Sequence, residues 1–488
     1  MNKIKYCWIS SVVFILAAVL PLQGCLSQKE DFASCVSSVT VLPQDNALRA
    51  QVEISLKQSC SFRILYWLSD KGEDSAQSTN TYSESAGTVL CHLNFLEERS
   101  KYTLQIVLDN GVKSKCLDFS TTSLPVDIPQ YEVEYCSPEF VNPDGYLLQW
   151  DASSPGYLTI CDLNGKIIWY QSFGAGIRTA SFNRKTGLFA VLCGFADGED
   201  SDDFYRLASD AFVCNLNGEI IFHRKASSSF VPFPHHDFSI LDNGDYLILS
   251  NFVKPFPVGT DSEMIDIWGD GFYVCDNEGS VLKTWDCFTE LNPSKIDYIN
   301  VLKVSKDYVH ANSVTMDSAG DYYLTLNRLN ELWKISGETL EVLYRVGAQG
   351  NIDLDSESQA YGFPSGGLHA ATVLSPDRIL CYDNGKQLGY SRAVLFNVNP
   401  HEKTVNYEFV VDMPKQYSSV NRSNVQIVSA DGTALNPSVL SENDLLLFGS
   451  TVSAKTVFED LNGNVLYVMS RSGISYRTYW IPSGALSR

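Results

Sequence analysis

Positive charge is scarce in this sequence of 488 residues. The chain has only 36 Lys and Arg residues but 57 Asp and Glu residues, so the formal net charge is −21. A surface of this kind repels nucleic acids and anionic membranes. The composition therefore argues against both partners, and any anionic ligand must be met by a local cluster of positive side chains.

Cysteine pairs with metal-binding spacing are also missing. No two of the 13 cysteines form a CxxC pair, and 11 remain once Cys7 and Cys25 near the N-terminus are set aside. This odd number, spread along the chain, does not indicate a disulfide framework or a zinc site. Cys161, Cys214 and Cys275 recur at the same place in successive repeats, which is typical of small buried packing residues. We predict no catalytic cysteine.

Long hydrophobic runs are limited to one, at the N-terminus. Lys3 and Lys5 precede the apolar stretch from Ile9 to Leu22, and Gln23-Gly24-Cys25 follows it. This order is typical of an export signal, and the run is short for a membrane span. We expect residues 1–24 to be a lipoprotein signal peptide and Cys25 to carry the lipid anchor.

The mature chain is then expected in a Gram-negative cell envelope, attached to the membrane only through its lipid. The periplasmic face and the outer surface of the outer membrane stay open as locations. An ordinary cleaved signal with a chance cysteine is the alternative interpretation.

Helical periodicity is almost absent, whereas short alternating hydrophobic runs are frequent. Residues 34–123 contain several such runs separated by turn residues, a pattern typical of a small immunoglobulin-like or fibronectin-like β-sandwich. Leu96 followed by Tyr102 resembles the tyrosine corner of such domains. Pro125 and Pro129 indicate a linker behind the sandwich.

Residues 131–488 contain a repeat that predicts the fold of the larger domain. Its clearest marker is a polar turn before a hydrophobic strand, found at Asp162-Leu163-Asn164-Gly165, Asn215-Leu216-Asn217-Gly218, Asp276-Asn277-Glu278-Gly279 and Asp460-Leu461-Asn462-Gly463. Weaker copies near residues 336 and 397 bring the number of units to six, each reading as about four strands. Such units must stack, and closing the ring removes free edges. The sequence predicts an all-β protein with a six-bladed β-propeller; a seventh blade is the alternative.

Four of the seven histidines open the first strand of three consecutive repeats: His235 and His236, His310, and His369. The first strand of a propeller blade lines the central channel, so these side chains are expected to converge on one rim. The second strand of each blade returns to the same rim, where Arg328 ends one such strand. The other three histidines fall outside this register.

Several familiar catalytic signatures are missing: a serine elbow, a P-loop and a glycine-rich dinucleotide turn. Imidazoles act as nucleophiles, acids or bases near neutral pH, and a guanidinium suits an oxyanion. This set fits transfer of an anionic group through a covalent histidine intermediate. The residues leave two alternatives open: a metal-dependent hydrolase or lyase with zinc on the histidines, and a non-catalytic propeller that binds glycans or proteins.

Several spaced strings resemble the bacterial arylsulfate sulfotransferase family, which needs no nucleotide donor. They are Asp144-Gly145-Tyr146-Leu147-Leu148, Phe233-Pro234-His235-His236-Asp237, Val309-His310-Ala311-Asn312-Ser313, Leu326-Asn327-Arg328, and His369 with Asp383-Asn384-Gly385. The resemblance covers the mature chain, because these enzymes also carry a small β-sandwich before a six-bladed propeller.

The resemblance implies transfer of a sulfuryl group from a phenolic sulfate ester to an acceptor phenol, with no cofactor. It implies that His369 is the nucleophile and that His236, His310 and Arg328 bind the sulfuryl oxygens. Asn312 is expected to help position the sulfuryl group. His235 is the alternative to His236 as a ligand of the sulfuryl oxygens.

The chain departs from the family pattern at Asn327, where relatives often carry serine, and at Tyr308, where tryptophan is expected. A disulfide near the nucleophile is also lacking. These differences leave the natural donor and acceptor open, and a homodimer is neither predicted nor excluded.

Overall fold

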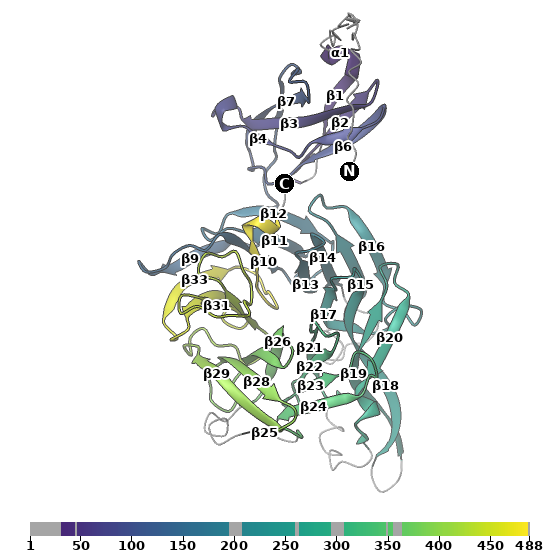
Figure 1. Ribbon diagram of the computed structural model, residues 1–488, viewed down its shortest axis with the longest axis vertical. Helices are drawn as coiled ribbons and strands as arrows, with labels where there is room; N and C mark the ends of the chain where they lie inside the picture. The colour runs from purple at the N-terminus through teal and green to yellow at the C-terminus, as the bar shows by residue number, and fades with distance from the viewer. Residues whose placement is uncertain are drawn as a thin grey trace, which may run out of the picture.

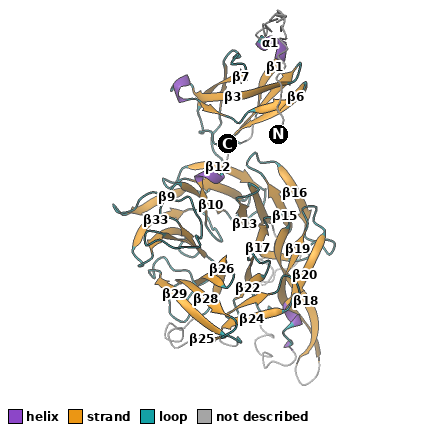
Figure 2. Cartoon of the chain, viewed as in Figure 1, coloured by secondary structure: helices purple, strands orange, loops and turns teal. Residues whose placement is uncertain are grey.

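The computed structural model describes residues 31–43, 46–194, 207–258, 263–293, 307–347, 350–354 and 364–486. The predicted signal peptide and Cys25 lie outside these residues. No helix within the described ranges has the length and apolar character needed to cross a membrane. The described chain is built almost wholly from strands, with helical turns at a few edges only (Figure 2).

Two small sheets form the N-terminal part of the molecule, drawn in purple in Figure 1. The first consists of β1 (Val36–Leu42), β2 (Ala50–Leu56) and β6 (Gly87–Leu93), preceded by the short helix α1 (Phe32–Cys35). The second consists of β3 (Cys60–Leu68), β4 (Gln77–Ser78), β5 (Tyr82–Glu84), β7 (Lys101–Leu108) and β8 (Leu117–Ser120), with the helical turn η1 (Glu73–Ser75).

The two sheets pack face to face because buried and more exposed side chains alternate along their strands. Every second residue of β2 is buried, and these side chains join those of β3 and β7 in one hydrophobic core. The hydroxyl oxygen of Tyr102 accepts a hydrogen bond of 2.9 Å from the backbone N–H of Glu97, the bond that a tyrosine corner makes.

Six sheets of antiparallel strands follow, arranged as a ring (Figure 1). Blade one has β10 (Gly145–Trp150), β11 (Tyr157–Cys161), β12 (Ile167–Ser172) and β34 (Tyr479–Pro482); blade two has β13 (Ile177–Asn183), β14 (Leu188–Cys193), β15 (Asp210–Cys214) and β16 (Ile220–Lys225). Blade three has β17 (Pro234–Ile240), β18 (Tyr246–Val258), β19 (Glu263–Cys275) and β20 (Val281–Asp286), followed by the turn η2 (Cys287–Thr289).

Blade four has β21 (Ala311–Met316), β22 (Tyr322–Leu326), β23 (Glu331–Ile335) and β24 (Val342–Gly347). Blade five has β26 (Leu368–Ser375), β27 (Arg378–Asp383), β28 (Arg392–Asn399) and β29 (Thr404–Asp412), with the short β25 (Asp353–Leu354) parallel to the last. Blade six has β30 (Asn424–Val428), β31 (Leu445–Ser450), β32 (Lys455–Asp460) and β33 (Val465–Arg471). The predicted fold class, a six-bladed propeller behind a small β-sandwich, is confirmed.

Two strands close the ring by pairing with strands that lie far from them in the sequence. The strand β34, which lies before the turn η4 (Ser483–Ala485), pairs with β10 and becomes the inner strand of blade one. The strand β9 (Tyr131–Cys136) adds an outer fifth strand to blade six. Blades one and six therefore each combine residues from both ends of the propeller sequence.

The marker turns depend on an acidic side chain and a glycine. The acidic side chain accepts hydrogen bonds from backbone N–H groups, and the glycine adopts a positive φ. In the first copy, Oδ1 of Asp162 accepts hydrogen bonds of 2.9 Å and 2.8 Å from the N–H groups of Asn164 and Lys166. Gly165 adopts a φ of +83°, which costs a glycine little. The turn fixes the hairpin between the third and fourth strands of its blade.

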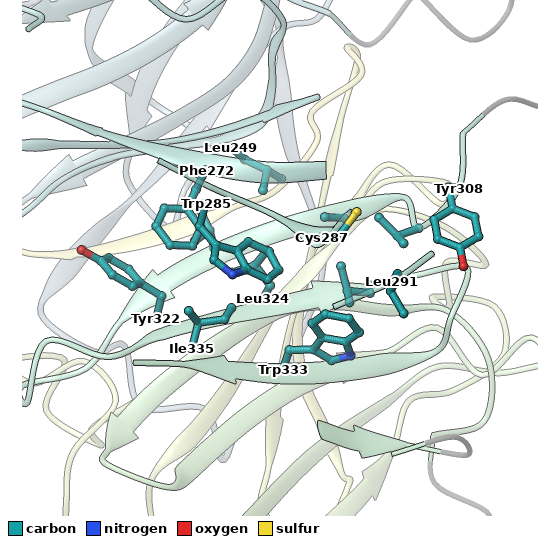
Figure 3. Close-up of a cluster of buried hydrophobic side chains, with 14 of the residues drawn as sticks. Leu249, Phe272, Trp285, Cys287, Leu291, Tyr308, Tyr322, Leu324, Trp333 and Ile335 are labelled. Atoms are coloured by element: carbon teal, nitrogen blue, oxygen red, sulfur yellow. The ribbon is translucent and has the colours of Figure 1, made fainter. Parts of the chain in front are cut away.

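Large side chains fill the space between adjacent blades. Figure 3 shows one such cluster between blades three and four, with the rings of Phe272 and Tyr322 at 4.4 Å and those of Trp285 and Trp333 at 6.1 Å. Truncating a buried side chain of this size to alanine costs roughly 3–5 kcal/mol. Tyr308 lies at one end of the cluster and anchors the chain two residues before His310.

Polar contacts attach the sandwich to blade one. A guanidinium nitrogen of Arg49 donates a hydrogen bond of 2.7 Å to the side-chain oxygen of Gln171. The hydroxyl oxygen of Tyr170 accepts a bond of 3.0 Å from the N–H of Ala47. The sandwich therefore lies against the outside of the ring, away from the channel (Figure 1).

Candidate active site

A pocket of about 300 Å³ opens where the inner strands of blades three, four and five begin. Three histidines from three different blades line it, together with an arginine two residues after the end of β22. The residues lining the pocket are His236, His310, Asn327, Arg328, His369, Lys386, Asn421 and Arg422.

Irregular backbone directs several of these side chains into the pocket. His236, His310 and Arg422 adopt φ values of +52°, +51° and +59°, which residues other than glycine rarely adopt. The strand pairing also shifts register beside each histidine. Bulges of this kind re-aim side chains, and each left-handed residue costs on the order of 1–3 kcal/mol. Such strain is concentrated at functional sites because the surrounding fold has to maintain it.

His369 is held in one tautomer by its neighbours. Its Nδ1 atom lies 3.1 Å from the carbonyl oxygen of Gly367 and in close contact with Oδ1 of Asn384. The amide group of Asn384 is fixed in turn, since its Nδ2 donates to the carbonyl oxygens of Ser419 at 2.5 Å and Arg422 at 3.2 Å. Nδ1 of His369 therefore carries the proton.

The other nitrogen of His369 carries a lone pair. Nε2 accepts a hydrogen bond of 3.2 Å from the backbone N–H of Arg422. The side chain is only 3% exposed, and burial, with a smaller contribution from nearby His310, lowers the pKa of His369 to about 3. The imidazole is thus neutral at ordinary pH, with a nucleophilic nitrogen at the wall of the pocket.

Asp307 orients two more members of the site. Its Oδ2 lies 2.5 Å from Nδ1 of His310 and 3.8 Å from a guanidinium nitrogen of Arg328. The backbone carbonyl of Asp307 also accepts a short hydrogen bond from Arg328. One buried carboxylate therefore orients both the imidazole of blade four and the neighbouring guanidinium.

The adjacent histidines of blade three have different surroundings. His235 is fully buried and places Nε2 at 2.9 Å from the carboxylate of Asp270, while its Nδ1 lies 2.7 Å from Nδ1 of His236. His236 lines the pocket, and its ring centroid is 5.4 Å from that of His310. His235 supports His236 from behind.

Asn312 also lies behind the pocket wall. Its Nδ2 donates a hydrogen bond of 2.8 Å to the carbonyl oxygen of Leu368, and its Oδ1 accepts one of 2.5 Å from Thr325. Arg477 donates to the backbone carbonyl of Asn312 at 2.6 Å and lies 3.3 Å from the carboxylate of Asp237. These contacts join blades three, four and five beneath the site. Asn312 and His235 therefore contact residues that hold or line the pocket, but they do not line it themselves.

The sequence analysis missed two cations. Lys386 and Arg422 line the pocket from loops, and the described lining contains no carboxylate. Burial, followed by the charge of Arg328, lowers the pKa of Lys386. Lys386 lies three residues after Asp383 at the end of β27, a position near the rim that a search for cations after second strands would have found. This pocket is positive within an acidic protein and suits an anion.

Two further observations concern histidines and metals. Within the described ranges, no group of three or more His, Cys, Asp or Glu side chains is arranged to hold a metal ion. His92 pairs with Glu219 and His223 with Asp210, both away from the pocket, and His401 is exposed.

Comparison with protein families places this pocket within the span of a family match. Residues 130–444 match the model described as Arylsulfotransferase (ASST), a span of more than half the chain that holds every residue of the pocket. The chain belongs to the arylsulfotransferase family. The resemblance stated from the sequence strings is thereby confirmed. The arylsulfotransferase family is a family of enzymes, and membership implies aryl sulfates as substrates.

No curated protein matches this arylsulfotransferase family member. Among solved structures, a protein of unknown function from Bacteroides caccae is 12% identical, with 69% of this chain and 99% of that chain covered and a TM-score of 0.41. An auxiliary nutrient binding protein from Bacteroides thetaiotaomicron is 9% identical, with 88% and 84% covered and a TM-score of 0.36. Similarities at this level say nothing about activity.

Proposed function

We propose that this protein transfers a sulfuryl group from a phenolic sulfate ester to an acceptor phenol through a sulfated His369. The observation that supports this most directly is the hydrogen bonding of His369. Its Nδ1–H is held by two carbonyl oxygens, so the lone pair is on Nε2, at the wall of a pocket lined by cations. The hydrogen bond that Nε2 accepts from the Arg422 N–H has to be given up when Nε2 attacks sulfur. A neutral imidazole facing an anion-binding pocket is suited to attack on sulfur.

In the first step, Nε2 of His369 forms a bond to sulfur while the bond from sulfur to the phenolic oxygen breaks. The departing phenoxide takes a proton from the Nε2–H of His310, which Asp307 orients. By analogy with phosphoryl transfer, the SO₃ group passes through a loose, in-line transition state that needs positioning and positive charge. Arg328 and Lys386 supply that charge, together with His236 when it is protonated.

The modified imidazole then carries a positive charge, which the carbonyl oxygens of Gly367 and Asn384 stabilise at Nδ1. In the second step, the oxygen of the acceptor phenol attacks sulfur, and the bond between nitrogen and sulfur breaks. The phenolic proton passes to His310, which restores the starting state. Phenoxides are good leaving groups, so aryl rather than alkyl esters suit this cycle.

We also propose that the enzyme works in the cell envelope, held there by a lipid on Cys25. The charged start, the short apolar run and Gly24 before the cysteine support this proposal.

Trapping the intermediate tests the mechanism. The full-length protein is mixed with an aryl sulfate and no acceptor, quenched under mild alkaline conditions, and digested for mass spectrometry. A peptide that contains His369 should gain the mass of one SO₃. His369→Asn should lose both this label and phenol-dependent release of the aryl group, whereas His401→Asn, at an exposed site on the same blade, should keep both.

Other outcomes would contradict the mechanism. Normal transfer by His369→Asn, or a label on another residue, would rule out His369 as the nucleophile. Release of the aryl group that needs no acceptor and stops on chelation would indicate a metal-dependent hydrolase.

A further inference from the structure

Three polar groups of blade three form a line that ends at the pocket. The carboxylate of Asp270, on β19, lies 2.9 Å from Nε2 of His235, and Nδ1 of His235 lies 2.7 Å from Nδ1 of His236. Asp270 and His235 are fully buried, whereas His236 lines the pocket. A buried negative charge is therefore connected with a group at the candidate active site.

Hydrogen bonds hold the carboxylate of Asp270 in place. Its Oδ1 accepts one of 2.5 Å from the side chain of Asn251, and its Oδ2 accepts one of 2.8 Å from the backbone N–H of Ala311, the residue after His310. Burial, followed by the charge of Asp270, raises the pKa of the nearby Cys287 thiol well above its usual value, so this thiol is neutral. The carboxylate is thus fixed in its position beside the imidazole of His235.

The spacing of the two imidazoles determines how their protons are arranged. Two ring nitrogens 2.7 Å apart share one proton, because two lone pairs or two N–H groups would repel each other. A ring nitrogen 2.9 Å from a carboxylate oxygen carries hydrogen, which places a second proton on Nε2 of His235. If the pair holds a third proton, it is on Nε2 of His236, whichever of the two rings carries the positive charge.

On the pocket side, cationic side chains oppose a positive charge on His236. The cations and imidazoles that line the pocket, or the small cavity beside it, together with His236 are Arg178, Arg328, Lys386, Arg422, His310 and His369. The ring of Tyr476 lies 5.4 Å from that of His236, and burial raises the pKa of its hydroxyl, so it is neutral. Asp237, the next residue in the strand, pairs with Arg477 at 3.3 Å. The attraction that favours a charge on the imidazole pair therefore comes from Asp270, at its buried end.

We propose that Asp270 and His235 are positioning residues that keep the imidazole pair protonated, so that the Nε2–H of His236 donates a hydrogen bond to a sulfuryl oxygen. The inference deepens the proposed function and rests on it, because it needs a sulfuryl group in this pocket. With the third proton present, Asp270 and the two imidazoles are neutral as a unit. Without it, a buried carboxylate is left uncompensated, which is costly. Asp307 contacts His310 directly, whereas Asp270 acts on His236 through a second ring.

The pH dependence of Asp270→Asn tests this inference. The substitution removes the charge and keeps an oxygen for the Ala311 N–H. With a chromogenic aryl sulfate and phenol, we expect kcat to fall about 10- to 100-fold relative to the unmodified enzyme at about pH 8, the range for groups that orient a metal-ligating histidine. The loss should shrink below about pH 6.5, where an ordinary histidine becomes protonated without a partner. Asp266→Asn, at an exposed position on the same strand, should match the unmodified enzyme at each pH.

A double substitution tests the route through His236. In His236→Gln the donor is already gone, so adding Asp270→Asn should cost no further activity, whereas independent structural effects would add. Additive losses, a loss in Asp270→Asn that does not depend on pH, or equal activities of Asp270→Asn and Asp266→Asn would overturn the inference while sulfuryl transfer stands.

If Asp270→Asn does not fold, the unmodified enzyme decides. NMR with isotope-labelled histidine nitrogens, assigned by the signals that His236→Gln removes, should show hydrogen on Nε2 of His236 at about pH 8. A lone pair on that nitrogen would overturn the inference. Absence of transfer by the unmodified enzyme to every acceptor would instead refute the proposed function.

Discussion

The Nε2 atom of His369 and the backbone N–H of Arg422 form a hydrogen bond of 3.2 Å across the boundary between blades five and six. The proposed nucleophile therefore meets a donor that no side-chain substitution removes, apart from proline. Once His369 carries a sulfuryl group, this N–H is placed to donate to one of the sulfuryl oxygens. The proposed mechanism therefore uses the main chain of Arg422, while its side chain lines the pocket.

Loss of the guanidinium at Arg328 should slow the chemical step. Arg328→Ala removes one preorganised donor to the sulfuryl oxygens, which is expected to raise the barrier by about 2.7–4 kcal/mol and lower kcat by about 10²–10³-fold. Steady-state kinetics with a chromogenic aryl sulfate and phenol measure this loss. Arg224→Ala, at an exposed position on β16, should leave kcat unchanged; an equal effect of both substitutions would contradict a specific role.

Asp307 should matter for catalysis although it does not line the pocket. Asp307→Ala removes the carboxylate that orients both His310 and Arg328. We expect kcat to fall about 10- to 100-fold, the range known for carboxylates that orient a metal-ligating histidine. The burst of aryl release in a stopped-flow experiment should slow by the same factor. Asp242→Ala removes an exposed carboxylate at the far end of blade three and should have no effect. A normal burst in Asp307→Ala would show that His310 and Arg328 need no such support.

The buried His369 should make stability depend on pH. Its pKa is about 3 in the folded protein against an ordinary value of 6.5, so between these values the unfolded chain binds the extra proton. Unfolding is therefore favoured as the pH falls from about 6.5 towards 3, by at most about 1.4 kcal/mol per pH unit. Above pH 6.5 this contribution is constant.

Urea unfolding of the wild-type protein and His369→Gln at several pH values isolates this effect. The stability of the wild-type protein relative to the variant should rise with pH up to about 6.5 and then level off. A difference independent of pH across this range would show that the imidazole titrates normally.

Lipid attachment at Cys25 can be checked in cells. Metabolic labelling with an alkyne fatty acid should label the mature protein, and Cys25→Ser should lose the label and leave the membrane fraction. Cys116→Ser, at an exposed cysteine of the sandwich, should be labelled normally. A label that survives Cys25→Ser would contradict the proposed anchor.

Local patterns were sufficient to predict the fold. The turn at Asp162 to Gly165 and its copies fix one hairpin per blade by contacts within five residues, so the repeat is visible in the sequence. The closing strand β34 and the added strand β9 were not predicted. Their partners lie at the opposite end of the propeller sequence, and no local signal encodes such a pairing.

The candidate site was predictable where residues occur in strand register and not elsewhere. His310 and His369 open inner strands, and Arg328 follows a second strand, so topology brings them to one rim. The choice between His235 and His236 depends on a bulge and a left-handed φ, which alternation alone does not show. Lys386 and Arg422 reach the pocket from loops of neighbouring blades, so spacing along the chain did not reveal them.

The pairing of β34 with β10 also orders events during biosynthesis. Because β34 follows blade six in the chain, blade one is incomplete until blade six has been made, and Tyr476 and Arg477 reach the hub at the same time. If the chain is exported as proposed, its ring closes only after translocation has delivered β34. The proposed sulfuryl transfer would then wait for that closure and would be kept apart from sulfate esters in the cytoplasm.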